Sequence, residues 1–493
     1  MQSLKIAVVW TVSLVIALTL LAGCGSSSNT TVPPPGPLNA DNVNLIFVVS
    51  EDLAYNALGD INPSTANLTN QGLQRSLLMA TFLQQRVLGM KNVTGIYVLE
   101  PMTHLQTALP AAIKYPDMAA PETVQQFALL NQITLFDHPG NSYPLNSSYA
   151  PGSVPTGFAT PTTYCATCQG IDFNDKENNN ENLLTSIVTK GTPGFYVISA
   201  PWETTSAMLE NINRIEGYNL TLPASYAGPN YIYALSISLS GSASLVTYNG
   251  NLNPPSTYPI LPTPTPAGTP CSAQTPFTIN VTGGVGGAVI PPGINTNETV
   301  YIVRHADAHP KPDWSDGNYV CAGQWRALDL PYALRGKFTP QPQQAYSLDP
   351  AQTSPGVPND WSAVAPSLTI EPYAIANDLP YGLVASFEIS DPNYAALTSN
   401  FFFTHNQTGN QFSDQTVLLA WSFAQIQPTV QALVSSYYPN VAAPTPTPVP
   451  GWPPNDYDTV WTVTLDAVGN LTVNNALCEG IDSDALPATC PQF

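Results

Sequence analysis

Charged residues are scarce in this sequence, and positive ones are the scarcest. Lysine, arginine, aspartate and glutamate make up 9% of its 493 residues, and 13 basic residues stand against 33 acidic ones, which gives a formal net charge of −20. A chain with so few cations does not attract nucleic acid or an anionic membrane face nonspecifically. The composition therefore predicts a protein with no nucleic-acid partner.

Long apolar runs are also missing beyond the N-terminal segment, which argues against a membrane-spanning helix in the rest of the chain. Near the N-terminus, Lys5 precedes an apolar run over residues 6–21, which ends in Leu21-Ala22-Gly23-Cys24. The run is shorter than the ~20 residues that cross a bilayer comfortably. This order of charge, apolar run and small residues is typical of an export signal.

The tetrad that ends in Cys24 resembles the bacterial lipobox, and the resemblance implies cleavage before Cys24 and a lipid on that cysteine. We expect residues 1–23 to be a signal peptide and residues 24–39, rich in serine and proline, to be a solvated tether. These features predict an extracytoplasmic protein anchored in a bacterial envelope membrane, with that membrane as a partner through Cys24.

Six cysteines remain after Cys24, namely Cys165, Cys168, Cys271, Cys321, Cys478 and Cys490. In an oxidising compartment an even number of cysteines predicts up to three disulfides, although the sequence does not fix their connectivity. The pairs 165/168 and 478/490 are close enough in sequence to close local loops. A redox or zinc site at Cys165 and Cys168 would need a second ligand pair or a strand-to-helix context, and the sequence offers neither. We predict no metal and no cofactor.

Proline-rich tracts over residues 261–270 and 444–454 interrupt the chain, and both are expected to be stiff and extended. The first tract lies in a predicted linker, residues 251–297, that separates a half over residues 40–250 from a half over residues 298–493. The two halves repeat a series of similar segments in the same order. The paired segments are 44–53 with 299–308, 72–76 with 323–327, 96–101 with 345–350, 107–112 with 369–374, and 195–215 with 417–434.

Each half alternates short apolar strands with amphipathic helices, a pattern that predicts α/β folding with a mostly parallel sheet and helices on both faces. We therefore expect two tandem three-layer α/β/α domains. Residues 457–465 alternate like a strand and are expected at the edge of the second sheet, and residues 401–403 are expected in a core strand. Ligands of such sheets bind at the carboxyl ends of the strands.

An Arg-His pair, Arg304 and His305, follows the apolar strand 300–303. Together with the Gly-x-x-Arg-Ala helix at 323–327 and the late strand 417–421, it resembles the histidine phosphatase superfamily, which has the phosphoglycerate-mutase-like fold. The resemblance covers most of both halves. It implies that His305 is the nucleophile that forms a phosphohistidine and that Arg304 binds the phosphate through its planar fork of donors.

The second half departs from this family pattern at two positions. The family has a second arginine three residues after a proline, where this chain has Thr353, and a second histidine after the late strand, where it has Phe423. His309, His405 or Arg326 would restore activity if one of them entered the pocket. Each lost donor to a developing anion costs on the order of 10²–10³ in rate, so the pattern favours an impaired site.

The first half departs further. Val49 and Ser50 stand where the second half has its Arg-His pair, and His104 stands three residues beyond Pro101 in place of the family's arginine. We expect this half to be a degenerate copy that keeps its core and lacks the site.

The sequence thus favours a catalytically impaired binding or scaffolding module in the envelope. Its partner would be a phosphate-bearing small molecule or an envelope protein. The alternatives are a phosphomonoesterase working through His305 and a surface adhesin without a small-molecule site. If the site is impaired, Arg304 is expected to pair with a carboxylate such as Asp307 or Asp349. It is also expected to retain phosphate binding in the millimolar range, about −4 kcal/mol.

Overall fold

A computed structural model describes most of the chain beyond the tether. The predicted signal peptide, Cys24, Cys165, Cys168, His309 and His405 lie outside the described residues. Among the described residues no helix is long and apolar enough to cross a membrane. The described residues are 34–53, 59–107, 114–132, 171–175, 178–262, 271, 274–307, 321–349, 353–354, 361–362, 364–384, 389, 391–404, 412–439 and 448–493.

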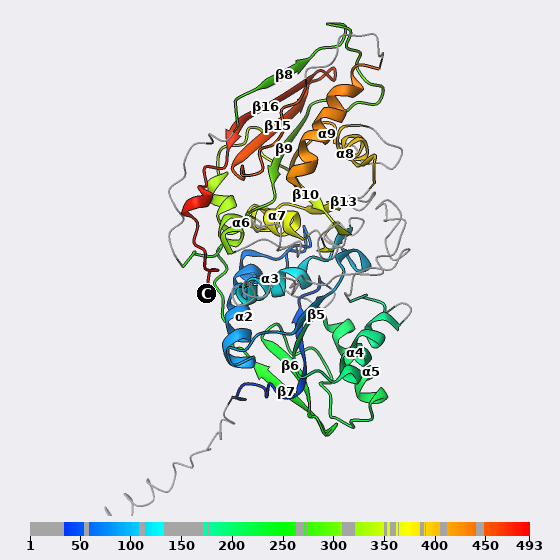
Figure 1. Ribbon diagram of the computed structural model, residues 1–493, viewed down its shortest axis with the longest axis vertical. Coiled ribbons are helices and arrows are strands. Elements are labelled where there is room, and N and C mark those ends of the chain that lie inside the picture. The colour runs from blue at the N-terminus through cyan, green and yellow to red at the C-terminus, as the bar shows by residue number, and fades with distance from the viewer. Residues whose placement is uncertain are drawn as a thin grey trace, which may run out of the picture. The chain divides into compact units, whose positions relative to one another are not determined.

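The first half contains a mixed sheet with the strand order β2-β5-β1-β6-β7 (Figure 1). The inner strands β1 and β5 are parallel and buried along their whole length, so both read as continuous apolar runs. β2 is parallel to β5, whereas β6 and β7 are antiparallel. The strands are β1 (Val43–Ser50), β2 (Gly95–Val98), β5 (Gly194–Pro201), β6 (Tyr231–Ile237) and β7 (Ala243–Asn249), with a small separate pair formed by β3 (Leu105–Thr107) and β4 (Lys114–Pro116).

Helices cover both faces of this sheet. On one face, Ile46 and Val48 of β1 pack in a cluster with α2 and α3, and on the other face Leu45 and Phe47 pack with α4 and α5. The helical elements are α2 (Asn70–Phe82), which continues as a π-helical turn η2 (Leu83–Val87), the 3₁₀ turn η3 (Pro101–Thr103), α3 (Ala119–Gln132), α4 (Asn179–Lys190) and α5 (Trp202–Ile215).

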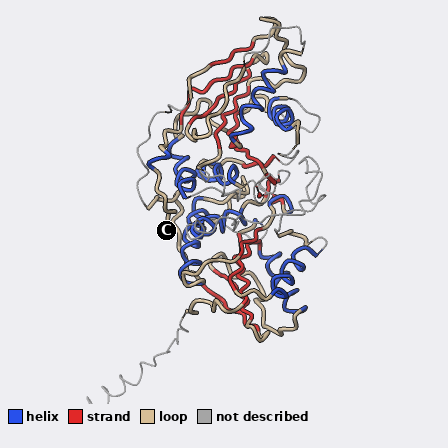
Figure 2. Tube along the Cα trace, viewed as in Figure 1, coloured by secondary structure: helices blue, strands red, loops and turns tan. Residues whose placement is uncertain are grey.

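The second half contains a larger mixed sheet with the order β13-β10-β14-β9-β15-β16-β8. Figure 2 shows strands in both halves of the described chain, with helices beside them. Its parallel strands are β13, β10, β14 and β9, and the other three are antiparallel. β8 lies in the segment predicted to be a linker, so this segment contributes a strand to the second sheet. The strands are β8 (Thr278–Val281), β9 (Glu298–Arg304), β10 (Gln344–Leu348), β13 (Tyr381–Val384), β14 (Thr416–Trp421), β15 (Thr459–Leu465) and β16 (Leu471–Cys478), with a small pair β11 (Thr353–Ser354) and β12 (Trp361–Ser362).

Helices again cover both faces of the second sheet. Tyr301 and Val303 of β9 pack in a cluster with α6 and α7, and Val300 and Ile302 pack with α8 and α9. Residues 401–403, expected in a strand, lie in α8, where their phenyl rings are buried. The helical elements are α6 (Cys321–Ala333), α7 (Ala365–Ala376), α8 (Tyr394–Phe403), α9 (Phe423–Ser436) and the 3₁₀ turn η5 (Ser483–Ala485).

The same strand order in both sheets agrees with the internal repeat. β2-β5-β1-β6-β7 corresponds to β10-β14-β9-β15-β16, and the second sheet adds one strand at each edge. β15 therefore lies between β9 and β16, and its prediction as an edge strand was wrong. The pairing of segments 107–112 and 369–374 was also wrong. Residues 369–374 lie in α7, whose counterpart in the order of elements is α3.

One close backbone contact explains the glycine that begins the repeated Gly-x-x-Arg segment in the first half. A Cβ added to Gly72 would lie 2.3 Å from the carbonyl oxygen of Asp60, so the start of α2 can approach this loop only without a side chain. Thr69 caps the helix, because its hydroxyl accepts a hydrogen bond from the Gly72 amide at 3.1 Å.

Two long-range disulfides crosslink the described chain, Cys271 with Cys478 and Cys321 with Cys490. The first joins the predicted linker to the end of β16, and the second joins the start of α6 to the C-terminal segment. The local bridge between residues 478 and 490, which their spacing allowed, is therefore wrong. Large loops closed in this way lose more entropy in the unfolded chain than local ones.

Side chains from both halves share two apolar clusters, so residues 36–493 form one compact unit. Leu73 and Leu77 of α2 pack with Leu328 of α6 and Ile375 of α7.

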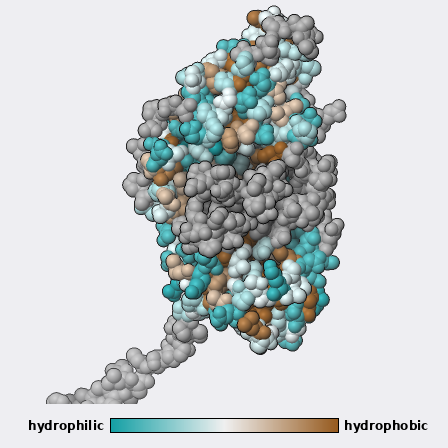
Figure 3. Space-filling view, in the orientation of Figure 1, coloured by the Kyte–Doolittle hydropathy of each residue, from teal (hydrophilic) through white to brown (hydrophobic). Residues whose placement is uncertain are grey.

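On the face shown in Figure 3 hydrophilic and hydrophobic residues are interspersed over the described surface.

A pair of buried carboxyl groups, Glu122 on α3 and Glu371 on α7, lies where the two helix layers meet. Burial raises the pKa of Glu122 to about 8, partly offset by its interaction with the nearby Glu371. Burial and the charge of Glu122 raise the pKa of Glu371 well above its ordinary value. The pair therefore holds at least one proton at neutral pH.

We expect the free energy of unfolding to fall as the pH rises from about 5 to about 8. The unfolded chain releases these protons near pH 4.5, whereas the folded chain keeps them until the pH reaches the raised values. Each proton that only the folded chain retains lowers the free energy of unfolding by about 1.4 kcal/mol for every pH unit in that window. Urea unfolding across this pH range should show that the free energy of unfolding declines less for Glu122→Gln than for the wild type. Glu210→Gln, an exposed substitution on α5, should leave the decline unchanged.

Candidate functional site

Equivalent positions at the carboxyl ends of β1 and β9 carry different side chains. β1 ends at Ser50 and continues into Glu51 and Asp52, and β9 ends at Arg304 and continues into His305 and Asp307. In both sheets this end of the strand faces the start of the helix after the late strand, because β5 runs into α5 and β14 runs into α9. The sequence predicts a site with Arg304 and His305 at the end of β9 and the loss of that site at the end of β1.

Arg304 is buried, with 3% of its surface exposed. The faces of its guanidinium group lie against two aromatic rings, 3.7 Å from the centroid of Tyr457 and 4.4 Å from that of Phe423. Its Nη1 donates to the carbonyl oxygens of Pro454 and Asp456. Burial lowers the pKa of Arg304 to about 10, so it stays charged at neutral pH. Its contacts are those of a cation held by aromatic faces and carbonyl groups.

His305 is also buried, and its ring lies edge-on to Phe423 and Tyr457 at 6.2 Å from each. Burial and the neighbouring Arg304 lower the pKa of His305 to about 3, so the ring is neutral. Its Nδ1 lies 2.9 Å from the Ala306 carbonyl oxygen, which places the ring proton on Nδ1 and leaves Nε2 unprotonated. A neutral Nε2 is the form that attacks phosphorus, but the ring is buried and packs near Phe423 and Tyr457.

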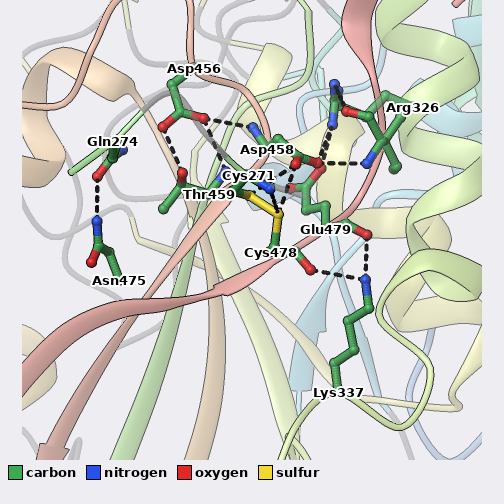
Figure 4. The surroundings of a disulfide bond; sticks show 11 residues. Cys271, Gln274, Arg326, Lys337, Asp456, Asp458, Thr459, Asn475, Cys478 and Glu479 are labelled. Atoms are coloured by element: carbon green, nitrogen blue, oxygen red, sulfur yellow. Dashed lines mark hydrogen bonds and ion pairs between the residues drawn. A yellow bond between two sulfur atoms is a disulfide. The ribbon is translucent and has the colours of Figure 1, made fainter. Parts of the chain in front are cut away.

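Arg326 is committed to a buried network around one disulfide (Figure 4). Its Nε donates to Asp307 at 2.5 Å, its Nη1 donates to Glu479 at 2.6 Å, and its Nη2 donates to Ser483 at 2.8 Å and to the Ile481 carbonyl at 3.0 Å. Asp307 is thus the partner of Arg326, whereas it was expected to pair with Arg304. Arg326 has its donors engaged and does not supply the missing phosphate ligand.

The Cys271–Cys478 disulfide and Asp458 also lie together in Figure 4, with the carboxylate 2.9 Å from each sulfur. This group has the residue types of a metal site. However, both sulfurs are bonded to each other and carry neither a proton nor a free thiolate charge, so they are not metal ligands in this state.

The first half, expected to lack a site, holds a cluster of ionisable groups at the end of β1. His104, between η3 and β3, lies with its Nε2 2.6 Å from Oδ2 of Asp52 and 3.8 Å from Oδ2 of Asp117. Its ring stacks on Phe173, with centroids 3.8 Å apart and planes 9° apart. The side chain of His104 is 16% exposed, whereas those of Asp52 and Asp117 are 3% and 0% exposed.

Residues close to Asp117 in the sequence form hydrogen bonds with both its side chain and its backbone. Its Oδ1 accepts hydrogen bonds from Gln106 at 2.7 Å and from the amide of Ala119 at 3.1 Å, so it also caps the start of α3. Its backbone amide donates to the carbonyl of His104 at 3.1 Å. Burial raises the pKa of Asp117 to about 7, although the charge of His104 opposes this rise.

The electrostatics of this cluster favour positive charge. Burial of the His104 ring opposes its protonation, but the hydrogen bond to Asp52 and the charges of Asp117, Asp52 and Glu203 outweigh burial and raise its pKa above 6.5. Nearby, burial raises the pKa of Glu51 to about 7, opposed by its 2.6 Å hydrogen bond from Tyr226. The cluster suits proton transfer or cation binding and opposes a phosphate ligand.

The nearest arginine of the first half does not change this balance. Arg75, the counterpart of Arg326, donates to Asp60 at 2.7 Å, to Asn230 at 2.6 Å and to the Leu252 carbonyl at 2.9 Å. In both halves the arginine of the Gly-x-x-Arg segment is therefore a structural ion-pair partner.

Little of this cluster could be found in the sequence. The sequence drew attention to His104 only as the residue three positions beyond Pro101, where the resembled family has an arginine, and it indicated no site in this half. Asp117 was missed because the sequence paired residues 369–374 of α7 with residues 107–112. The counterpart of α7 is α3, and Asp117 lies just before the start of α3. No family model matches this chain, and no curated protein matches it.

We expect the Asp52→Asn substitution to lower the pKa of His104, because the ring loses its charged acceptor. Nuclear magnetic resonance of the histidine ring nitrogens as a function of pH, without metal ions, measures this. Comparison with His104→Gln identifies the signal among the five histidines. Asp41→Asn should leave this pKa unchanged, because the exposed Asp41 precedes the start of β1, whereas the cluster lies at the end of that strand. A titration that is the same in wild type and Asp52→Asn would contradict the assigned contact.

Proposed function

We propose that this chain is a lipid-anchored envelope protein, built from two phosphoglycerate-mutase-like α/β/α domains, that acts as a binding or scaffolding module without phosphatase activity. The single observation that carries this proposal is the burial of Arg304 and His305 beneath Phe423 and Tyr457. A phosphate ester must reach both an arginine and a histidine, and here aromatic side chains lie against both.

The fold assignment in this proposal is supported by the matching strand orders and by the placement of Arg304 at the end of a central parallel strand. In the family that the chain resembles, this strand end carries the catalytic Arg-His pair. Phe423 occupies the position of the family's second histidine, at the start of α9, and contributes one of the two rings against Arg304. Phe423 therefore replaces one phosphate ligand of the family, the second histidine. Its ring also fills the space beside the other ligand, Arg304.

The proposal also revises the expected phosphate affinity. Arg304 is 3% exposed, its Nη1 donates to two carbonyl oxygens and two aromatic rings lie against its guanidinium group, so little of its surface is open to an anion. The net charge of −20 further opposes anion binding. We therefore propose that the folded protein does not bind inorganic phosphate measurably.

The soluble protein should show no turnover of p-nitrophenyl phosphate between pH 4 and pH 8, and titration calorimetry should detect no phosphate binding. Tyr457→Ala should uncover Arg304 and allow phosphate binding in the millimolar range, about −4 kcal/mol. The control Tyr332→Ala, at an exposed tyrosine of the same half, should bind no phosphate. Turnover by the wild type that is lost in His305→Ala would instead support a phosphohistidine enzyme.

The anchoring part of the proposal depends on Cys24. In a bacterial host, labelling with a fatty acid should tag the wild-type chain and place it in the membrane fraction. Cys24→Ser should lose both the label and the membrane association, because one serine oxygen does not replace the thiol that accepts the lipid. Labelling that persists in this variant would contradict lipidation at Cys24.

A further inference from the structure

Three potential ligand atoms for a metal ion come together at the end of β1 in the first half. They are a carboxylate oxygen of Asp52, the Nε2 atom of His104 and a carboxylate oxygen of Asp117, and all three lie within 4.8 Å of one another. We propose that these three side chains bind one divalent transition-metal ion, with zinc as the ion best suited to them. This inference concerns a different site from the buried Arg-His pair and does not depend on the proposed function.

The spacing of the three ligand atoms suits a single ion. Metal ligands that each lie about 2.0–2.2 Å from a tetrahedral zinc ion are separated from one another by roughly 3.3 Å. Oδ2 of Asp52 and Oδ2 of Asp117 lie 2.6 Å and 3.8 Å from Nε2 of His104. Changes of a fraction of an ångström to about one ångström in these side chains would therefore place all three around one ion.

One buried oxygen points to a missing ligand in the cluster. Oδ2 of Asp117 is the atom that faces His104, and it is buried without a hydrogen-bond partner, whereas Oδ1 of the same residue accepts two hydrogen bonds. A buried carboxylate oxygen without a partner is costly. A cation between Asp117 and His104 would satisfy this oxygen.

The charges around the cluster also favour a divalent ion. Two carboxylates face one imidazole, and Glu203 at the start of α5 adds further negative potential at His104. A protonated His104 compensates only one of the two aspartate charges, whereas a divalent ion compensates both. The stacking of Phe173 fixes the plane of the His104 ring, and Gln106 fixes Asp117, so both ligands are held in position before the ion arrives.

The ligand set distinguishes between classes of metal ion. Calcium and magnesium prefer oxygen ligands and larger coordination numbers, whereas one imidazole with two carboxylates suits zinc and its first-row neighbours. The His104 side chain is 16% exposed, more than either aspartate, so an ion would enter from its side and water would complete the coordination.

Titration calorimetry on the full, untagged chain, first stripped with a chelator, tests this site with zinc chloride as the probe. We expect one zinc ion per chain, and at least a tenfold weaker binding in His104→Gln and in Asp117→Asn, since even supporting residues of metal sites contribute 10–100-fold to affinity. Asp41→Asn, which changes an exposed carboxylate of the same half outside the cluster, should bind zinc like the wild type. Millimolar calcium should not displace the ion.

Magnetic resonance of the wild-type histidine rings keeps the test decisive if a variant does not fold. Zinc should shift the His104 ring signals before those of the other four histidines. The proposal is overturned if the stripped wild type takes up no zinc, if both cluster variants bind as tightly as the wild type, or if zinc shifts a different histidine and leaves His104 unchanged.

Discussion

An arginine in the first helix of each half ties together loops at the strand ends, and it is buried in the second half and partly buried in the first. Arg326 joins the loop after β9 to the segment after β16 through Asp307 and Glu479, and Arg75 joins α2 to the loops that carry Asp60 and Asn230. Removing one partner of such a pair leaves a buried charge uncompensated, which costs roughly 3–5 kcal/mol. With only 13 lysines and arginines in the chain, each of these pairs takes a large share of the available positive charge.

The shortage of cations explains how the remaining buried carboxyl groups are accommodated. Glu122 and Glu371 face each other and share a proton, Glu51 accepts a hydrogen bond from Tyr226, and Asp117 relies on Gln106 and the start of α3. In each of these four cases burial raises the pKa of the carboxyl group, because the protein supplies neutral donors or protons in place of positive charge. The result is a protein whose interior is best suited to mildly acidic conditions.

The two strand ends have diverged within one repeated architecture. The end of β9 keeps an arginine and a histidine but surrounds them with Tyr457 and Phe423, and the end of β1 has neither but gathers Asp52, His104 and Asp117. Tyr457 precedes β15, and the pairing of β15 with β9 brings this ring close to Arg304 at the end of β9.

The sequence alone determined the strands β1, β2, β5, β9, β10 and β14 and the helices that follow most of them, because buried parallel strands are short apolar runs and the repeat doubled each signal. It did not determine that β15 joins β9, that residues 401–403 are helical, or which cysteines pair, since strand order and disulfide connectivity depend on contacts between distant segments. The same limit applies to the sites. The sequence placed Arg304 and His305 at a strand end, but only the tertiary structure decided that aromatic rings cover them and that Asp117 meets His104, because local periodicity carries no information about which loops converge.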